Sequence, residues 1–461
     1  MGYALLRALA GIALRWYYSD IEIAGGERIP RRGPLLLVVN HPNALVDALL
    51  VGWLMPRRVL ITAKATIFAN PVGAVLLRWL GVLPLRRASD EATTPNAHTS
   101  SAARNAETFR AVQAALAKGR CILIFPEGKT PDEPALAPLK SGAARMTLHA
   151  RESGVRGIAI LPIGLVFERK ERPRSRVFIE VGEPILLDTW HADDSRSATD
   201  ALTADIEVRL RALTLSYPDN DAAVRTTHLA MTLASLVEPL DSVSNVRGFA
   251  VETGIARRVD GLTSFLTSAE PAMRDHAEQL VERLRVVQDQ AKGHGISLDD
   301  ARIELGRRSG ARFVLRESWY VLIGGPIALW GRINHWLPLR AARLIAMRHV
   351  ESAADPAMRT IVAGAALILV AYLAQTLVVG ALWGWIVALI YVISLPIAAD
   401  VNFTLTDRMH RAVGRTRAYL VLRRDPELRG ILETELAQLR LDVLAFDRGA
   451  SAAMSPESRA Q

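Results

Sequence analysis

Residues 35–50 read LLLVVNHPNALVDALL and change from one hydrophobic pattern to another near their centre. The unbroken apolar run that ends at Val39 is typical of a buried strand. Pro42 and Asn43 favour a turn, and the segment after them has the pattern of a helix that Asn43 could cap. The stretch therefore predicts a strand, a short loop and a helix, with His41 where the strand ends.

His41 and Asp47 are the first candidates for chemistry, because a carboxylate beside an imidazole makes a general base. The carboxylate fixes the tautomer of the ring and stabilises the imidazolium that forms when a hydroxyl gives up its proton. On one continuous helix the two would point to different faces, so they meet only if His41 lies in the loop before the helix. On spacing alone, a capping aspartate beside an incidental histidine fits as well.

Short apolar runs recur between about 20 and 188, separated by longer segments of helical pattern. They are IEIA (21–24), LLLVV (35–39), VLIT (59–62), CILIF (121–125), GIAILPI (157–163) and VFIEV (177–181). This alternation is typical of an α/β domain. Cys121 is the single cysteine and begins one of these runs, so we interpret it as a buried strand residue rather than a nucleophile.

Arg86 and Arg87 follow the apolar segment LGVLPL (80–85). Guanidinium groups bind phosphate through two hydrogen bonds at once, which makes the pair a candidate phosphate site. In a chain with 56 lysines and arginines, ordinary surface charge would be the better explanation if this segment stood alone.

Another group of polar residues follows the apolar run at 121–125. The chain there reads FPEGKT (125–130), which places Glu127, Gly128 and Lys129 at a strand exit, and Lys140 comes shortly before the next helix. A carboxylate, a glycine turn and two compact positive charges at the end of a strand suit a phosphorylated ligand.

Taken in order, these segments resemble the glycerol phosphate acyltransferase superfamily, which includes glycerol-3-phosphate and 1-acylglycerol-3-phosphate acyltransferases. The resemblance covers about residues 20 to 190. Its blocks are NHPNALVD (40–47), GVLPLRR (81–87), FPEGKT (125–130) and ILPIGLVF (160–167), followed by FIEVGEPI (178–185). It implies an α/β fold with a central mixed sheet flanked by helices.

The resemblance also implies roles for particular residues. His41 and Asp47 would be the catalytic pair, with no metal, and Pro162 would lie in a block that is less directly catalytic. The implied substrate site has Arg87 and Lys140 on the phosphate, Glu127 and Gly128 in the acceptor pocket, and Arg86 and Lys129 as further binding residues.

The implied activity is transfer of a fatty acyl group to the hydroxyl of a glycerol phosphate, with an acyl-CoA or acyl carrier protein thioester as donor and no cofactor. Five residues rather than the usual four separate His41 from Asp47. That spacing resembles the branch that acylates glycerol 3-phosphate or dihydroxyacetone phosphate. Acylation of 1-acylglycerol 3-phosphate is one alternative, and an inactive lipid-binding scaffold is another. Because no serine or cysteine lies in a nucleophile-elbow context, direct transfer is expected.

The composition fits a membrane-bound enzyme better than a nucleic-acid-binding protein. Hydrophobic residues make up 50% of the chain and charged residues 22%, which suits a soluble body attached to a membrane. The net charge is +9, but no basic run is interleaved with aromatic residues. Membrane lipids are therefore expected partners, and nucleic acid is not.

Two regions outside the blocks indicate contact with a membrane. Residues 1–19 have apolar side chains at helical spacing, which predicts an interfacial amphipathic helix, with packing onto the enzyme as the alternative. Residues 360–399 carry no charge. One helix of that length would measure about 60 Å, against a hydrocarbon core of about 30 Å, so spans near 361–379 and 385–399 are expected. Arginines on both flanks predict that the catalytic domain faces the cytoplasm at the cytoplasmic membrane.

The sequence thus predicts five regions. They are an amphipathic helix (1–19), an acyltransferase domain (20–190), a helical insert of unknown role (191–316), an interfacial segment with a two-span transmembrane hairpin (317–400) and a helical cytoplasmic tail (401–461). Gly324, Gly325 and Pro326 interrupt the uncharged stretch 318–331, which favours a buried or re-entrant segment there over a span.

Overall fold

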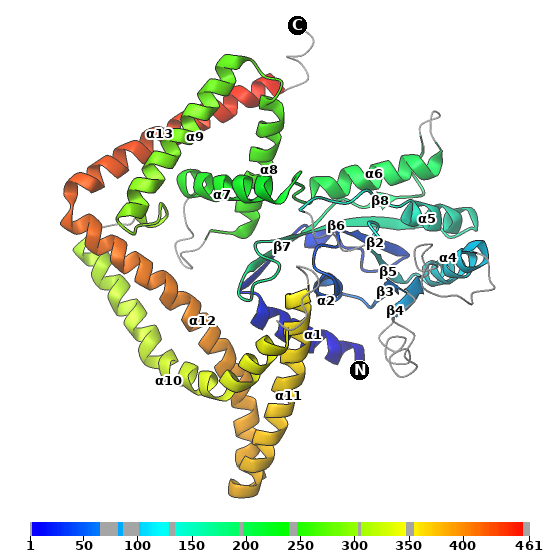
Figure 1. Ribbon diagram of the computed structural model, residues 1–461. Helices are drawn as coiled ribbons and strands as arrows, with labels where there is room; N and C mark the ends of the chain where they lie inside the picture. Colours follow the sequence, from blue (N-terminus) through cyan, green and yellow to red (C-terminus); the bar gives the residue numbers. More distant parts are fainter. Residues whose placement is uncertain are drawn as a thin grey trace. The chain divides into compact units, whose positions relative to one another are not determined.

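The computed structural model describes residues 2–64, 82–85, 101–128, 134–192, 197–238, 247–302, 306–346 and 355–454. The chain forms two compact units (Figure 1). The first comprises Met1–Asn220 with Ala342–Ala365, and the second comprises Asp221–Ala341 with Ala366–Gln461.

A mixed β-sheet forms the centre of the first unit. Its described strands are β1 (Asp20–Ala24), β2 (Leu35–Val39), β3 (Val59–Lys64), β4 (Val82–Leu85), β5 (Cys121–Ile124), β6 (Ala159–Phe167), β7 (Arg176–Val181) and β8 (Ile185–Leu186). They lie in the order β1-β7-β6-β2-β5-β3-β4, and β8 pairs with β6. Neighbouring strands are parallel, except that β6 is antiparallel to β7 and β8. The predicted α/β fold with a central mixed sheet is confirmed.

Strand β2 lies inside the sheet and explains why helices cover both of its faces. All five of its residues are buried. Leu35, Leu37 and Val39 belong to one hydrophobic cluster, while Leu36 and Val38 belong to another, because successive side chains of a strand point to opposite faces. A strand that is buried on both faces reads as a continuous apolar run, as residues 35–39 do.

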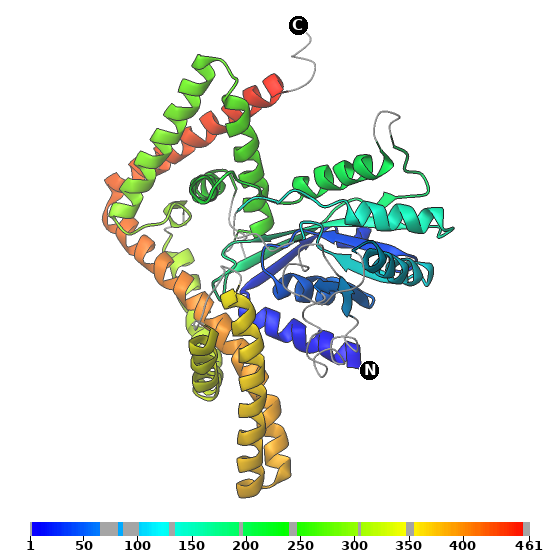
Figure 2. The ribbon, with the colours of Figure 1, turned by 45° about the vertical axis from the view of Figure 1, so that its right-hand side comes forward.

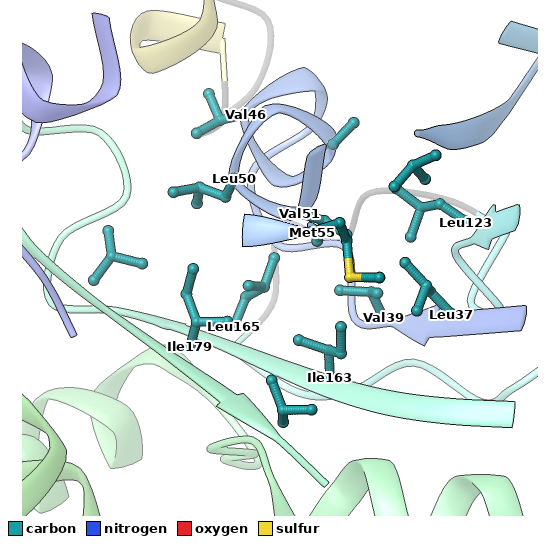
Figure 3. Packing of buried hydrophobic residues seen from close by; sticks show 14 of the residues in the cluster. Leu37, Val39, Val46, Leu50, Val51, Met55, Leu123, Ile163, Leu165 and Ile179 are labelled. Carbon is teal, nitrogen blue, oxygen red and sulfur yellow. The ribbon is translucent and has the colours of Figure 1, made fainter. Parts of the chain in front are cut away.

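The helices of the first unit supply the two layers. They are α1 (Gly2–Tyr17), the short η1 (Gly26–Arg28), α2 (Leu45–Leu54), α4 (Ser101–Ala117), α5 (Gly142–Glu152) and α6 (Ala198–Ala212). The first cluster lies between the sheet and α2, where Val46, Leu50 and Val51 meet Leu37 and Val39 (Figure 3). Residues of α4, α5 and α6 form the second cluster on the opposite face.

Helix α1 packs against α2 along one side and leaves apolar side chains exposed along another. Leu14 is fully buried in the first hydrophobic cluster. Leu5, Leu9 and Ile12 remain exposed at helical spacing. The helix therefore packs onto the rest of the protein, which was one of the two alternatives for residues 1–19. Its row of exposed apolar side chains also suits an interface with lipid.

The carboxyl ends of three parallel strands meet at one edge of the sheet. Leu35 of β2 lies opposite Cys121 of β5 on one side and Ala159 of β6 on the other. Cys121 is buried, as predicted, and burial raises the pKa of its thiol to about 12. The residues that follow β2, β5 and β6 therefore converge at an edge where α/β proteins commonly bind ligands.

The second unit is helical among its described residues. Its helices are α7 (Asn220–Val237), α8 (Phe249–Leu266), α9 (Pro271–Gly293), the short η4 (Asp300–Arg302), α10 (Arg307–Ala346), α11 (Asp355–Trp383), α12 (Trp385–Arg424) and α13 (Pro426–Met454), of which α7, α10 and α11 also contribute residues to the first unit. Helices α9 and α13 lie side by side (Figures 1 and 2). Leucines of both helices form a third hydrophobic cluster with the end of α12.

Helices α11 and α12 provide the predicted apolar hairpin. They meet at Gly384, whose φ of +87° favours glycine. Arg359–Trp383 and Trp385–Arg424 are the two candidate membrane spans among the described helices. In the most apolar 18-residue stretch of each helix, only 17% and 22% is buried within the protein, as expected if lipid covers the remainder.

Two helices of the second unit differ from what the sequence indicated. Helix α12 continues well beyond residue 399, through Pro396 and Gly414, and ends at Arg424. Helix α10 runs without a break through Pro326, where the sequence favoured a buried or re-entrant segment. Helix α10 is supported at this point by α12, which lies very close to it. A Cβ on Gly331 of α10 would lie 2.2 Å from the carbonyl oxygen of Ala398 on α12.

Candidate active site

Asn40 fixes the point at which the chain leaves strand β2. Its side-chain amide donates to the carbonyl oxygen of Leu165 on β6 at 2.9 Å, and its carbonyl oxygen accepts from the Leu165 N–H at 2.7 Å. The buried side chain thus takes the place of a backbone pairing just beyond the last strand residue. His41 follows immediately, at the edge of the sheet.

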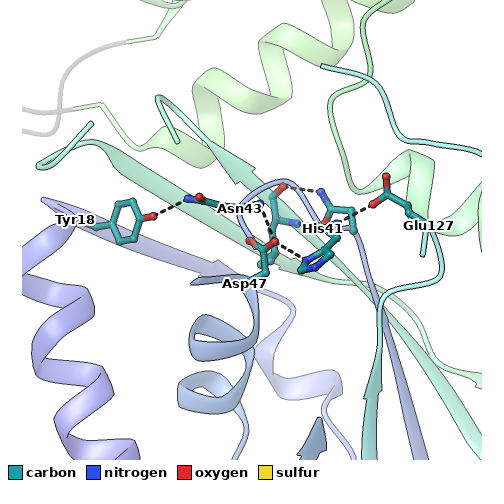
Figure 4. Close-up of polar contacts among 7 residues, drawn as sticks. Tyr18, His41, Asn43, Asp47 and Glu127 are labelled. Carbon is teal, nitrogen blue, oxygen red and sulfur yellow. Dashed lines mark hydrogen bonds and ion pairs between the residues drawn. The ribbon is translucent and has the colours of Figure 1, made fainter. Parts of the chain in front are cut away.

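His41 lies in the loop before α2 and is in contact with Asp47 (Figure 4), as a catalytic pair requires. The distance from His41 Nδ1 to Asp47 Oδ2 is 3.0 Å. Asp47 lies in the first turn of α2, and His41 precedes that helix. An ionised carboxylate only accepts hydrogen bonds, so the proton of the neutral imidazole is assigned to Nδ1 and Nε2 is left as the basic nitrogen.

The loop between His41 and Asp47 is not held by the predicted helix cap at Asn43. Ala44, with φ 48°, occupies the N-cap position of α2 and makes no side-chain cap bond, so the prediction that Asn43 caps the helix was wrong. The backbone N–H of Asn43 instead donates to Asp47 Oδ2 at 2.8 Å. Because the carboxylate satisfies this loop N–H, the Asn43 side chain is available for other partners.

Asp47 is completely buried, and its charge is balanced locally. Burial raises the pKa of the carboxyl group, while the hydrogen bond and charge of His41, the Asn43 N–H and the charge of Lys170 act in the opposite direction. Asp47 Oδ1 has no hydrogen-bond partner among the described residues. The carboxylate thus depends on its contacts with His41 and Asn43 to remain ionised in an apolar setting.

Glu127 ties two loops together at the same edge. Its Oε1 accepts from the His41 backbone N–H at 2.7 Å, and its Oε2 accepts from the Ala137 N–H at 3.0 Å. Its side chain is buried, and burial raises the pKa of the carboxyl group. Both oxygens are therefore engaged in positioning the backbone, including that of the candidate base. The His41 ring also stacks on Phe125, with ring centroids 3.8 Å apart.

Gly128 and Lys140 are brought together beside this loop. Gly128 has a φ of +73°, and a Cβ on it would lie 3.0 Å from Cδ, Cε and Nζ of Lys140. The Lys140 side chain therefore passes directly over the glycine, and Lys140 is exposed. Its backbone N–H donates to Pro126 at 2.9 Å, which closes the loop.

The remaining residues of the predicted site cannot be added to this group from the described part of the chain. Arg86, Arg87 and Lys129 lie outside the described residues. Pro162 is a buried residue inside β6, opposite Val38, so it supports the sheet rather than its edge. Among the residues that the structure describes, no group of three or more histidine, cysteine or acidic side chains could hold a metal ion.

Sequence reasoning missed several residues that shape the site. Tyr18 and Lys170 contact Asn43 from distant parts of the chain, and Phe125 contacts the ring of His41. Phe125 stands in the same FPEG segment as Glu127, so its position next to the site had a signal in the sequence. Tyr18 had none, because it lies 25 positions from Asn43 on another element.

The chain is similar in sequence to known acyltransferases. The acyltransferase family model matches residues 20–166. Glycerol-3-phosphate O-acyltransferase 2 of Saccharomyces cerevisiae is 36% identical over 122 residues, which are 25% of this chain and 16% of that protein. An uncharacterized acyltransferase of Schizosaccharomyces pombe is 24% identical over 296 residues, or 46% of this chain and 44% of that protein. A 1-acyl-sn-glycerol-3-phosphate acyltransferase of Borreliella burgdorferi is 26% identical over 165 residues, or 36% of this chain and 58% of that protein.

The matched segment contains the sheet edge, the His41–Asp47 pair and Glu127, and it is an acyltransferase domain. This domain belongs to the glycerol phosphate acyltransferase superfamily. The chain spans less than half the length of each of the two fungal relatives described above.

Proposed function

We propose that the protein is a membrane-bound O-acyltransferase that transfers a fatty acyl group from a thioester to the hydroxyl of glycerol 3-phosphate. The contact between His41 Nδ1 and Asp47 Oδ2, at 3.0 Å on the carboxyl edge of the sheet, is the observation that carries this proposal. It supplies a general base with an oriented ring and a basic nitrogen free of the carboxylate.

In the proposed reaction, His41 Nε2 takes the proton of the acceptor hydroxyl while the hydroxyl oxygen attacks the thioester carbonyl carbon. The tetrahedral intermediate then breaks its carbon–sulfur bond. The departing thiolate receives the proton from His41, so the acyl ester and the free thiol leave with the enzyme unchanged. Asp47 stabilises the imidazolium between these steps.

The phosphate of the acceptor would bind to the exposed Lys140, with Arg86, Arg87 and Lys129 as further proposed contacts. Lys140 is positioned for this by Gly128, over which its side chain passes. Glu127 would act on the acceptor indirectly, because both of its oxygens already accept from backbone N–H groups.

Glycerol 3-phosphate is proposed over a lysophospholipid on two grounds. Five residues separate His41 from Asp47, as in the branch that this sequence resembles. The relative with 36% identity over 122 residues is named a glycerol-3-phosphate O-acyltransferase. Dihydroxyacetone phosphate is a second acceptor to test in the same class. The proposed donor is an acyl-CoA or an acyl carrier protein thioester, and no cofactor is required.

The second candidate function is acylation of 1-acylglycerol 3-phosphate. It is favoured by the similarity to the Borreliella burgdorferi protein, which covers 58% of that relative. Both reactions would use the same base. An enzyme for the second reaction would need a wider acceptor pocket, because its acceptor already carries an acyl chain.

To test the assignment, membranes that contain the protein are supplied with a long-chain acyl-CoA or an acyl carrier protein thioester. One radiolabelled acceptor is added at a time: glycerol 3-phosphate, dihydroxyacetone phosphate or 1-acylglycerol 3-phosphate. We expect acylation of glycerol 3-phosphate with at least tenfold higher kcat/KM than 1-acylglycerol 3-phosphate. A reversed preference would replace the first-step assignment with the second. No transfer to any of the three acceptors, from either donor type, would overturn the proposed function.

A further inference from the structure

Tyr18 carries the end of helix α1 into the candidate active site. Its backbone N–H donates to the carbonyl oxygen of Leu14 at 2.8 Å, which extends the last turn of α1 by one residue. Its side chain is 1% exposed and its ring contacts the rings of Tyr17 and Phe167, with centroids 4.9 and 5.9 Å away. Packing on several sides therefore fixes where its hydroxyl points.

The Tyr18 hydroxyl contacts the loop that joins His41 to Asp47. It accepts a hydrogen bond from Asn43 Nδ2 at 3.1 Å, and the same amide also donates to the carbonyl oxygen of Lys170 at 3.2 Å (Figure 4 shows the Tyr18 contact). The backbone N–H of Asn43 donates to Asp47 Oδ2, which is the oxygen that also binds His41. Tyr18 is thus connected to His41 through Asn43 and Asp47.

We propose that Tyr18 is a positioning residue for the catalytic pair: its hydroxyl holds the Asn43 amide, and this holds the loop that aligns Asp47 with His41. The inference rests on the proposed function for its effect on turnover. The role differs from that of a catalytic residue, because Tyr18 acts through Asn43.

The loop needs such support for two reasons: one of its residues has an unfavourable backbone conformation, and a buried polar atom lacks a hydrogen-bond partner among the described residues. Ala44, next to Asn43, has a φ of 48°, a conformation that L side chains rarely adopt and that persists when surrounding contacts enforce it. Asn43 is fully buried, and its Oδ1 has no hydrogen-bond partner among the described residues. Removing the Tyr18 hydroxyl leaves the Asn43 amide with the Lys170 carbonyl as its remaining partner, so reorientation becomes easier.

Burial also keeps Tyr18 suited to this role. It raises the pKa of the Tyr18 phenol well above its usual value, and the neighbouring Tyr17 and Asp47 act in the same direction. The group therefore remains a neutral hydroxyl, which adds no negative charge beside the buried carboxylate of Asp47.

The chain offers a matched control in the adjacent residue. Tyr17 is also buried, and its hydroxyl donates to the carbonyl oxygen of Glu171 at 3.4 Å, next to Lys170, rather than to a residue of the loop between His41 and Asp47. Tyr17→Phe and Tyr18→Phe each delete one buried hydroxyl from the same turn of chain. A general packing or stability effect would appear in both variants, whereas a positioning effect would appear only in Tyr18→Phe.

The test compares the full-length wild type, Tyr18→Phe and Tyr17→Phe in membranes by two readouts. The first is steady-state acyl transfer: we expect Tyr18→Phe to lower kcat at least tenfold with KM for acceptor and donor within twofold of wild type, and Tyr17→Phe to retain kcat within twofold. The second is the rate at which diethylpyrocarbonate modifies His41, followed by mass spectrometry. We expect at least threefold faster modification in Tyr18→Phe alone, because a ring released from Asp47 is more accessible.

The two readouts separate the inference from the proposed function. Equal kcat and equal modification rates in the two variants would overturn the positioning role, even if the wild type is an active acyltransferase. A wild type without acyl transfer, together with selective modification of His41 in Tyr18→Phe, would overturn the proposed function and support the positioning role.

Discussion

At the scale of single residues, the backbone conformation of Gly128 bears on Lys140, the proposed phosphate contact. Its φ of +73° disfavours a side chain, and a Cβ there would press on the Lys140 side chain at 3.0 Å. We expect Gly128→Ala to destabilise the protein by roughly 1–2 kcal/mol through its left-handed backbone and to raise KM for the phosphorylated acceptor severalfold by displacing Lys140. Steady-state kinetics and thermal unfolding measure the two effects.

Gly157 provides the control for this substitution. Its φ is +69°, and no atom lies within 4 Å of the Cβ that alanine would add. Gly157→Ala should therefore cost a similar amount of stability and leave KM unchanged. A rise in KM shared by both variants would show that backbone strain, rather than contact with Lys140, disturbs acceptor binding.

Glu127 gives a prediction about pH. Burial raises its pKa above the ordinary value of 4.5, so the folded state binds the proton more tightly than the unfolded state. Stability contributed by this group is therefore lost as pH rises from 4.5 through the raised pKa. Glu127→Gln removes this dependence of stability on pH. It also removes one acceptor for a buried N–H, which costs roughly 1–3 kcal/mol. The difference in Tm between wild type and variant should narrow with rising pH, and a constant difference would be evidence against a raised pKa.

Residue contacts were predictable from the sequence only over short distances. A turn between a strand and a helix made the His41–Asp47 contact possible, and the family resemblance of the neighbouring blocks was needed to expect it. The bonds from Glu127 to His41 and from Asn43 to Tyr18 join positions 86 and 25 residues apart. They depend on how β5 and α1 are placed beside β2, which no local pattern reveals. For the same reason, the fully occupied oxygens of Glu127 could not be foreseen.

At the scale of elements, the packing of α10 on α12 depends on one glycine. A Cβ on Gly331 would meet the backbone of Ala398, whereas a Cβ on Gly325 would have no atom closer than 3.9 Å. We expect Gly331→Ala to lower the unfolding temperature of the full-length protein in detergent micelles, because the helices must separate or shift. Gly325→Ala should leave it unchanged or raise it, since alanine favours a helix. Equal effects of the two substitutions would contradict a close approach of these helices.

Elements were predicted well where one pattern decides them. The apolar runs at 35–39 and 121–125 became strands because a doubly covered sheet needs continuous apolar residues. The region around Pro326 was less predictable. A proline weakens an isolated helix, but the neighbouring α12 lies against α10 and supports it.

At the scale of the whole molecule, the hairpin of α11 and α12 predicts a membrane topology. Trp385 begins α12 at the turn of the hairpin, and Arg424 ends it. In right-side-out vesicles we expect a membrane-impermeant maleimide to label Trp385→Cys directly and Arg424→Cys only after permeabilisation, because arginines favour the cytoplasmic side. The buried Cys121 should give little background. Labelling of both positions from the same side without permeabilisation would contradict a span between them.

The whole-molecule account has one central claim, that His41 held by Asp47 is the general base for acyl transfer. The most direct test is the kcat for acyl transfer of full-length His41→Gln in membranes, beside His149→Gln on α5, whose ring contacts Phe109 away from the catalytic loop. The account predicts that His41→Gln loses a factor of about 10² to 10⁴ in kcat, the usual contribution of a general base, while His149→Gln remains within a factor of about two. A His41→Gln variant that keeps kcat within about tenfold of the wild type, which is worth about 1.4 kcal/mol or less, would contradict it.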